Sequence, residues 1–252
     1  MTTATLPPDV WIVWQLARHV RDGETVASGE DSALAASAVL LAKHTHAPHA
    51  TVFCFHLPAW FPFQEGNGEF FDLAARGRLD LFFLSGAQID RRGNVNLHAI
   101  GHPWEAPPKV RFPGARGSAV LTATAGRVVL YKTEHSARGL VPAVDVRSAV
   151  GRYAEGVRRG RGVVALHTPL AGFTMSEAGE LELASLVPGH TVEEVRAATG
   201  WPLRVREPFE TVPPPPPEAL DVLTTVVARE IRPAYPLMAR TLRTLRRRLA
   251  RF

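Results

Sequence analysis

A turn of small residues follows an apolar run near the middle of the chain. The run Leu81–Leu84 leads through Ser85 into Gly86, Ala87 and Gln88. Small residues let the backbone pass close to a ligand, and an open parallel sheet usually binds its ligand where its strands end. The turn is therefore a candidate ligand-binding site.

Charged and amide side chains follow this turn. Arg116 lies in a glycine-flanked loop, where its guanidinium group is either a bidentate ligand for a phosphate or carboxylate or simply solvated. Asp90, Asn94 and Asn96 are typical of a turn in which Asx side chains bond nearby backbone N–H groups.

Histidines cluster earlier in the chain. His44, His46 and His49 are closely spaced, but the first two point apart near a helix end, and no carboxylate or thiol completes a set of metal ligands. We expect no metal site.

Strand-like and helix-like patterns alternate through most of the chain, which predicts parallel strands joined by helical crossovers. We therefore expect a three-layer α/β fold with an open, mostly parallel sheet and its site at the carboxyl ends of the strands. Helices are expected at 10–20, 34–41 and 69–75, and strands at 24–28, 50–55, 79–84, 128–131, 143–146, 162–166 and 180–186.

The last third of the chain has clear boundary signals. Thr191 and Glu194 form a capping box that begins a helix, which Gly200 stops. The run Pro213–Pro217 must be extended, because proline fixes φ and has no N–H. We predict a main domain at 1–212, and a spacer with C-terminal helices (218–231, and from 237 onward) at 213–252, packed on the body or on a partner.

Composition agrees with a soluble globular protein. The 252 residues are 46% hydrophobic, enough for a full core, and no apolar run reaches the roughly 18 residues of a membrane helix. Cys54 is the only cysteine, and the segment Met1–Pro8 lacks the features of a signal peptide. We expect a cytoplasmic protein.

The basic charge is concentrated at one end. Six arginines lie in residues 240–252, and removing their charges from the net +5 leaves −1 for residues 1–239. Leucines at helical spacing make this tail an amphipathic helix with a basic face. We expect it to be solvated while its leucines dock on the body or a partner; nucleic acid or an anionic membrane surface is the less favoured reading.

The segment Gly86–Asn96, with its Gly-Ala-Gln-Ile-Asp and Gly-Asn-Val-Asn motifs, resembles the β subunit of family I coenzyme A transferases of the glutaconate CoA-transferase type. Pro108–Arg111, the turn Gly114–Ala119 and the segment Leu186–Gly200 extend the resemblance. It implies the fold of the NagB/RpiA/CoA transferase-like type, an α subunit of similar size, an acyl-CoA substrate, and no cofactor or metal beyond the CoA of the substrate.

The chemistry implied by this resemblance is transfer of CoA between carboxylic acids. It needs a carboxylate nucleophile and hydrogen-bond donors for the oxyanion of each tetrahedral intermediate. Our candidates for CoA and oxyanion binding are Gly86, Ala87, Gln88, Gly114, Arg116, Gly117 and Ser118. The alternative is that these glycines only make tight turns.

The sequence departs from the family at the nucleophile. The family glutamate lies seven residues past an Ala-Pro pair, and this count from Ala47-Pro48 reaches Phe55, which cannot form an acyl anhydride. A shift of one residue gives Cys54 or His56. Either His56 is a general base for water, or it is a partly exposed turn residue.

Three readings accommodate this departure. The chain is similar in spacing to the small subunit of steroid-ring-opening CoA hydrolases, in which the resemblance places the catalytic glutamate on the α subunit. Alternatively, Glu30, Glu65 or Glu69 reaches the site, or the chain is a non-catalytic binding subunit. The resemblance places the site at the subunit boundary, with residues 28–32, 54–57, 86–90 and 114–118 on this side.

Overall fold

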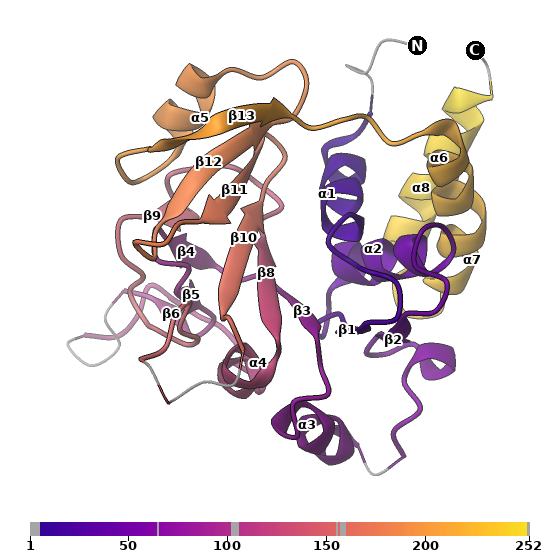
Figure 1. Ribbon diagram of the computed structural model, residues 1–252, viewed down its shortest axis with the longest axis horizontal. Coiled ribbons are helices and arrows are strands. Elements are labelled where there is room, and N and C mark those ends of the chain that lie inside the picture. Colours follow the sequence, from indigo (N-terminus) through magenta and orange to yellow (C-terminus); the bar gives the residue numbers. More distant parts are fainter. Residues whose placement is uncertain (1–5, 65, 102–105, 155, 157–159, 251–252) are drawn as a thin grey trace.

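Helices and strands alternate along the chain and form three layers, a central sheet with helices on both faces (Figure 1). The computed structural model describes residues 6–64, 66–101, 106–154, 156 and 160–250. Helices α1 (Pro8–Ala17) and α2 (Ala33–Lys43) cover one face of the sheet, and α3 (Asn67–Ala75) and α4 (Ser118–Thr124) contribute to the core on the other.

Eight strands of the described part of the chain form the main sheet, in the order β13-β12-β11-β10-β8-β3-β1-β2. The pairs among β2, β1, β3, β8 and β10 are parallel, whereas β11 pairs antiparallel with both β10 and β12. The strands are β1 (Thr25–Ala27), β2 (Thr51–Phe53), β3 (Leu81–Leu84), β8 (Arg127–Tyr131), β10 (Val163–His167), β11 (Ala171–Met175), β12 (Leu181–Leu186) and β13 (Val205–Thr211). The expected α/β fold with a mostly parallel sheet is confirmed.

Successive residues of the central strands separate two hydrophobic cores. In β3, Leu81 and Phe83 pack into the core with α1 and α2, whereas Phe82 and Leu84 pack into the core with α3 and α4. Strand side chains point alternately to the two faces, so a strand buried on both sides is continuously apolar. This explains the apolar run from which the sequence predicted β3.

Two small sheets follow β3 in the chain, and one of them extends the second core. This sheet contains β4 (Gln88–Asp90), β5 (Val95–Asn96) and β9 (Leu140–Val141), and the other pairs β6 (Ala99–Ile100) with β7 (Val110–Arg111). The helix with the predicted capping box is α5 (Val192–Ala198), in which the Thr191 hydroxyl accepts from the Glu194 N–H.

The C-terminal helices pack on the body of this chain. After β13, the chain passes through prolines into α6 (Pro217–Val222), a π-helical turn (Leu223–Val227), α7 (Ala228–Glu230) and α8 (Pro236–Leu249). Apolar residues of all these elements belong to the core of α1 and α2, and Figure 1 shows α1 and α2 between the sheet and the C-terminal helices. No helix among the described residues is long and apolar enough to cross a membrane.

The predicted strand at 143–146 is wrong. These residues form a loop, in which the Asp145 N–H donates to Gln88 Oε1 (3.0 Å) and the Asp145 carboxylate accepts from the Gly101 N–H (2.7 Å). The loop therefore satisfies its polar groups without a ladder. The sequence also missed β11 and β13, and it predicted one continuous helix over 218–231 where the structure has a π-helical interruption.

Candidate functional site

A pocket of about 380 Å³ lies at the carboxyl ends of the central parallel strands. Residues 29–32 follow β1, Phe55 follows β2, and residues 85–87 follow β3; Tyr131 ends β8. The segment 112–116, which leads into α4, forms another part of the wall. The pocket therefore lies at the carboxyl ends of the strands, where we expected the site.

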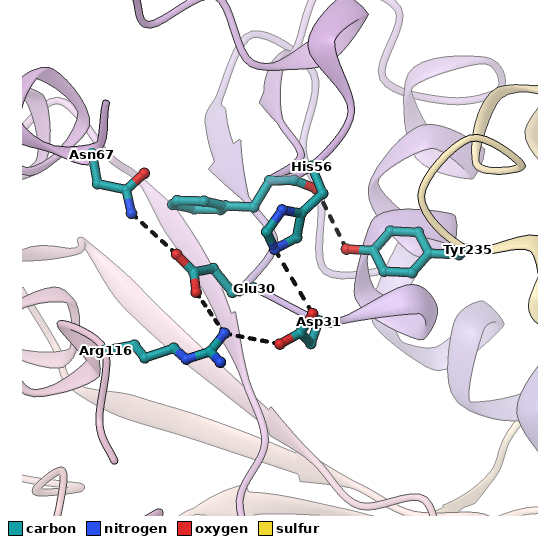
Figure 2. A network of polar contacts seen from close by, with 7 residues as sticks. Glu30, Asp31, His56, Asn67, Arg116 and Tyr235 are labelled. Atoms are coloured by element: carbon teal, nitrogen blue, oxygen red, sulfur yellow. Dashed lines mark hydrogen bonds and ion pairs between the residues drawn. The ribbon is translucent and has the colours of Figure 1, made fainter. Parts of the chain in front are cut away.

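An ionic network joins two sides of this pocket (Figure 2). Arg116 Nη1 donates to Glu30 Oε2 and to Asp31 Oδ2, both at 2.8 Å. The other Glu30 oxygen, Oε1, accepts from Asn67 Nδ2 at 3.0 Å, so α3 also contributes. These hydrogen bonds, to Glu30 first and Asp31 second, raise the pKa of the Arg116 guanidinium above its ordinary value.

His56 extends the network at the rim. Its Nε2 lies 3.7 Å from Asp31 Oδ1, an ion-pair distance if the imidazole is protonated. The exposed fractions of the side chains are 50% for His56, 72% for Asp31, 45% for Arg116 and only 21% for Glu30. Glu30 is therefore the carboxylate held farthest from solvent.

Backbone strain is concentrated in the same network. Among the described residues, the non-glycine residues with positive φ are Asp31 (52°), His56 (63°) and Arg116 (45°). Left-handed backbone is unfavourable for side chains of this size, and it tends to persist where a site requires it. Residues from three separate loops adopt this unfavourable conformation in one network, which makes the pocket our candidate functional site.

Phe55 occupies the position seven residues past Ala47-Pro48, and its side chain forms part of the pocket wall. Its ring is buried and lies 4.5 Å from the ring of Phe61 and 5.1 Å from that of Phe70, measured between centroids. Cys54 packs into the opposite core, where burial raises the pKa of its thiol to about 12. The end of β2 therefore presents neither a carboxylate nor a thiolate to the pocket.

Lys132 fixes the turn of small residues through hydrogen bonds to its backbone. Its buried ammonium donates to the Gly86 and Ala87 carbonyl oxygens, at 2.9 and 3.0 Å, and burial lowers its pKa. A Cβ at Gly86 would lie 2.3 Å from Val95 Cγ1, so this position requires glycine. Both turn residues line the pocket, but the Ala87 N–H already donates to the Asn96 carbonyl (2.9 Å).

The Gln88 side chain is buried among protein groups and does not face the pocket. It is buried, it is absent from the pocket lining, and its Oε1 accepts from Asn96 Nδ2 at 2.7 Å. Asp90 accepts from the N–H of Arg92 and of Asn94, which is the turn chemistry that the sequence indicated.

The predicted turn at 114–118 borders the pocket in part. Gly114, Arg116 and Ser118 line it, whereas Gly117 lies behind, where a Cβ would come within 2.3 Å of the Phe71 ring. Gly117 has a φ of 87° and precedes α4, so the tight-turn interpretation fits it well. The predicted oxyanion and CoA roles of these residues stay predictions.

The clustered histidines face different partners. His44 Nε2 contacts Glu230, His46 contacts the carbonyls of Ala17 and Val20, and His49 contacts Asp22. Within the described ranges, no group of three potential metal-ligating side chains comes together. Of the alternative carboxylates, Glu69 accepts from the Gln64 N–H, and Glu65 lies outside the described residues.

Sequence reasoning missed three residues that support the pocket. Asn67 bonds Glu30, Lys132 holds the small-residue turn, and the Tyr235 hydroxyl donates to the Phe55 carbonyl at 3.4 Å. Burial raises the pKa of Tyr235 to about 12. No motif surrounds these residues, and only folding brings them to the site.

Sequence comparison finds relatives over most of the chain. A family model described as coenzyme A transferase matches residues 11–198. One subunit of the 3-oxoadipate CoA-transferase of Pseudomonas knackmussii is 33% identical over 195 residues, which cover 68% of this chain and 73% of that protein. The IpdB subunit of the cholesterol ring-cleaving hydrolase of Rhodococcus jostii is 33% identical over 100 residues, 38% of this chain and 34% of that protein.

Solved structures share the fold. The decarboxylase AibA/AibB superposes with a TM-score of 0.72 at 28% identity, covering 86% of this chain and 93% of the other. Glutaconate coenzyme A-transferase from Acidaminococcus fermentans superposes with a TM-score of 0.78 over 88% and 94% of the two chains. At 20% identity, the latter similarity concerns the fold alone.

Proposed function

Because this chain belongs to the coenzyme A transferase family, we propose that it is the β subunit of a heteromeric enzyme acting on acyl-CoA thioesters. The pocket at the ends of β1, β2 and β3 receives the acyl part of the substrate. The observation that carries this proposal is the strained network of Glu30, Asp31, His56 and Arg116 at that pocket.

The partner is an α subunit of the same family and similar size. Relatives of this chain are named as subunits of larger enzymes, and the pocket rim is polar and largely solvent-exposed here. Within the segments 28–32, 54–57, 86–90 and 114–118, the exposed rim network faces the boundary, whereas Cys54 and Gln88 are buried. The complex needs no metal or organic cofactor beyond the CoA of its substrate, and buried, free Cys54 suits a reducing cytoplasm.

The end of β2 favours a reaction in which this chain supplies no nucleophile. Phe55 presents an aromatic ring where acyl transfer needs a carboxylate, and this ring is fixed within an aromatic cluster. The reacting carboxylate then comes from the α subunit and water is the acceptor, so the reaction is hydrolysis of a CoA-linked ring or of the thioester itself. This chain contributes the pocket wall and the rim network.

A second candidate is transfer of CoA between carboxylic acids, which is the activity named for the 3-oxoadipate relative. It is favoured by Glu30, a carboxylate that lines the pocket and has low exposure. In this reading the Glu30 carboxylate, freed from Arg116 and Asn67, attacks the thioester carbonyl and expels CoA thiolate, which forms a mixed anhydride; the thiolate then attacks the Glu30 carbonyl and releases the first acid. The hydrogen bonds from Arg116 and Asn67 to Glu30 oppose the first step, so we rank this candidate second.

The assembled α/β complex distinguishes the candidates. A panel of acyl-CoA esters is incubated with and without acceptor acids, free thiol and new CoA esters are measured, and hydroxylamine traps any acyl-enzyme. Hydrolysis without an adduct on this chain supports the first candidate, whereas an adduct on Glu30 with CoA transfer supports the second. A fully assembled complex that binds acyl-CoA without turnover would leave this chain a binding subunit and reject both.

A further inference from the structure

A second cavity lies on the C-terminal helices, apart from the residues of the proposed active site. It has a volume of about 550 Å³ and is formed by the π-helical turn, α7 and α8. Four of its lining residues are arginines, and no acidic residue lines it. The arginines are Arg229, Arg232, Arg243 and Arg246.

Counter-charges for these arginines are missing among the residues that the structure describes. Within the part of the chain that the structure describes, no ion pair includes any of the four, although Arg116 and Arg127 each pair with a carboxylate. The nearest acid in sequence, Glu230, contacts His44 on the other side. A concave surface lined by one sign of charge concentrates the field and attracts anions.

Packing of the C-terminal helices fixes the backbone positions of the four arginines. Arg243 and Arg246 are three residues apart on α8, next to the face that buries Leu242 and Leu245. Arg229 and Arg232 have the same spacing at the end of the other helical segment. The two pairs bring guanidinium groups of like charge to one concave surface, where a bound anion would reduce their mutual repulsion.

The π-helical turn is a second, independent observation. Leu223–Val227 interrupts an otherwise α-helical segment, and three of its residues, Thr224, Thr225 and Val226, line the cavity. Such turns are rare and often occur at functional sites. Here the turn shapes the wall that faces the arginines of α8.

We propose that this cavity binds a small molecule carrying two or more phosphate groups. Guanidinium forks bind phosphate oxygens in bidentate pairs, and four of them match the charge of a polyphosphate or of a nucleotide with several phosphates. The cavity volume lies in the range of small-molecule sites, on the order of 300–1000 Å³. A concave site of this size favours a small ligand over a nucleic-acid duplex.

The phosphate groups have two candidate sources, a free nucleotide or the phosphorylated end of CoA. Tyr235, three residues beyond Arg232, donates to the Phe55 carbonyl at the active-site pocket, so the two sites are joined by a short piece of chain. Phosphate binding at the cavity stands without the proposed acyl-CoA chemistry. Only the CoA source depends on it.

Inorganic tripolyphosphate is the first probe, titrated calorimetrically into the full chain, or into its complex, at about 0.15 M salt. The test variant is Arg229→Gln with Arg243→Gln, one arginine from each wall. The matched control is Arg240→Gln with Arg248→Gln, which removes the same charge from the side of α8 next to Pro7. Both variants change exposed side chains, and circular dichroism confirms their folding.

We expect stoichiometric binding that weakens at least tenfold in the test variant and less than twofold in the control. ATP, CoA and dephospho-CoA then compete with the probe. Tighter binding of CoA than of dephospho-CoA or ATP identifies CoA as the source, and tighter binding of ATP identifies a free nucleotide. Absence of tripolyphosphate binding, equal losses in both variants, or tighter binding of a DNA duplex would overturn the proposal, whatever the outcome of the turnover assays.

Discussion

The Arg116 guanidinium lies 2.8 Å from the Glu30 carboxylate, and this contact joins the loop before α4 to the carboxyl end of β1. The two residues are 86 positions apart in the chain. Because the same Nη1 atom also contacts Asp31, the position of one guanidinium sets two carboxylates at once. The geometry of the pocket mouth therefore depends on Arg116.

Arg116→Gln and Glu30→Gln should each lower kcat/KM of the assembled complex at least about tenfold. Their combination should lower it no further than the worse single change, because the two residues act as one unit. A double-mutant cycle by steady-state kinetics measures this. Arg138→Gln breaks an exposed pair with Glu134 and is the control. Additive losses would show that Arg116 and Glu30 act independently.

His56→Gln should abolish turnover while the complex stays assembled, if the imidazole is the general base for water. Glutamine keeps the hydrogen-bonding character of the side chain and its approximate size, but it cannot take up a proton. Native mass spectrometry verifies assembly, and a kinetic assay measures turnover. An unchanged rate discards the base role and leaves His56 as a rim residue held beside Asp31.

The sequence was sufficient to predict those parts of the candidate site that directly follow a strand of the parallel sheet. The apolar run at Leu81–Leu84 indicated a buried strand, and parallel strands bring their carboxyl ends to one edge. Residues after β1, β2 and β3 therefore had to meet. Their meeting is confirmed, with Glu30, Phe55 and Gly86 in one pocket.

The supporting contacts were not predictable because they depend on tertiary packing. Tyr235 contacts Phe55 across 180 positions, and Lys132 reaches the small-residue turn across 45 or more. The predicted strand at 143–146 failed for a related reason: its alternating pattern resembles a strand, but Asp145 bonds Gln88 and Gly101. Backbone N–H groups donate to side-chain oxygens in this segment instead of to the backbone of a neighbouring strand.

Phe55→Ala should lower the free energy of unfolding by about 3 kcal/mol, the lower end for truncating a buried phenylalanine, because one side of the ring borders the pocket. The loss comes from its contacts with Phe61 and Phe70. Chemical denaturation measures it. Phe55→Leu keeps most of the apolar volume and should cost clearly less; equal costs would mean that ring packing contributes little.

Lys132→Met should lower kcat more than it changes KM, because the Gly86 and Ala87 carbonyls lose their donor and the turn shifts. Leaving these partly buried acceptors unpaired should also cost about 1 kcal/mol of stability. Lys43→Met is a matched control, since Lys43 also donates to two carbonyl oxygens, those of Pro48 and Ala50, away from the pocket. Loss of kcat in both variants would make the effect one of general stability.

Acid should destabilise the protein through a partly buried histidine pair. His19 Nε2 lies 2.6 Å from His167 Nε2, and Gln15 Oε1 accepts from His167 Nδ1, so the neutral His167 ring receives its second hydrogen bond from His19. Burial first, and then the charge of Arg127, lowers the pKa of His19 from 6.5 to about 4. Burial and the neighbouring His19 also lower the pKa of His167.

The sign follows from which state binds the proton. Between pH 6.5 and about 4 the unfolded chain protonates His19 while the folded chain does not, so the free energy of unfolding falls as the pH decreases through this window. The full shift corresponds to about 3 kcal/mol. Denaturation of wild type and His19→Gln at a series of pH values measures the difference, with the range of about pH 7 to 8 as the internal control, because the imidazoles are neutral there. Since glutamine cannot be protonated, the variant should lose less stability with acid; parallel curves would show that this pair does not set the acid sensitivity.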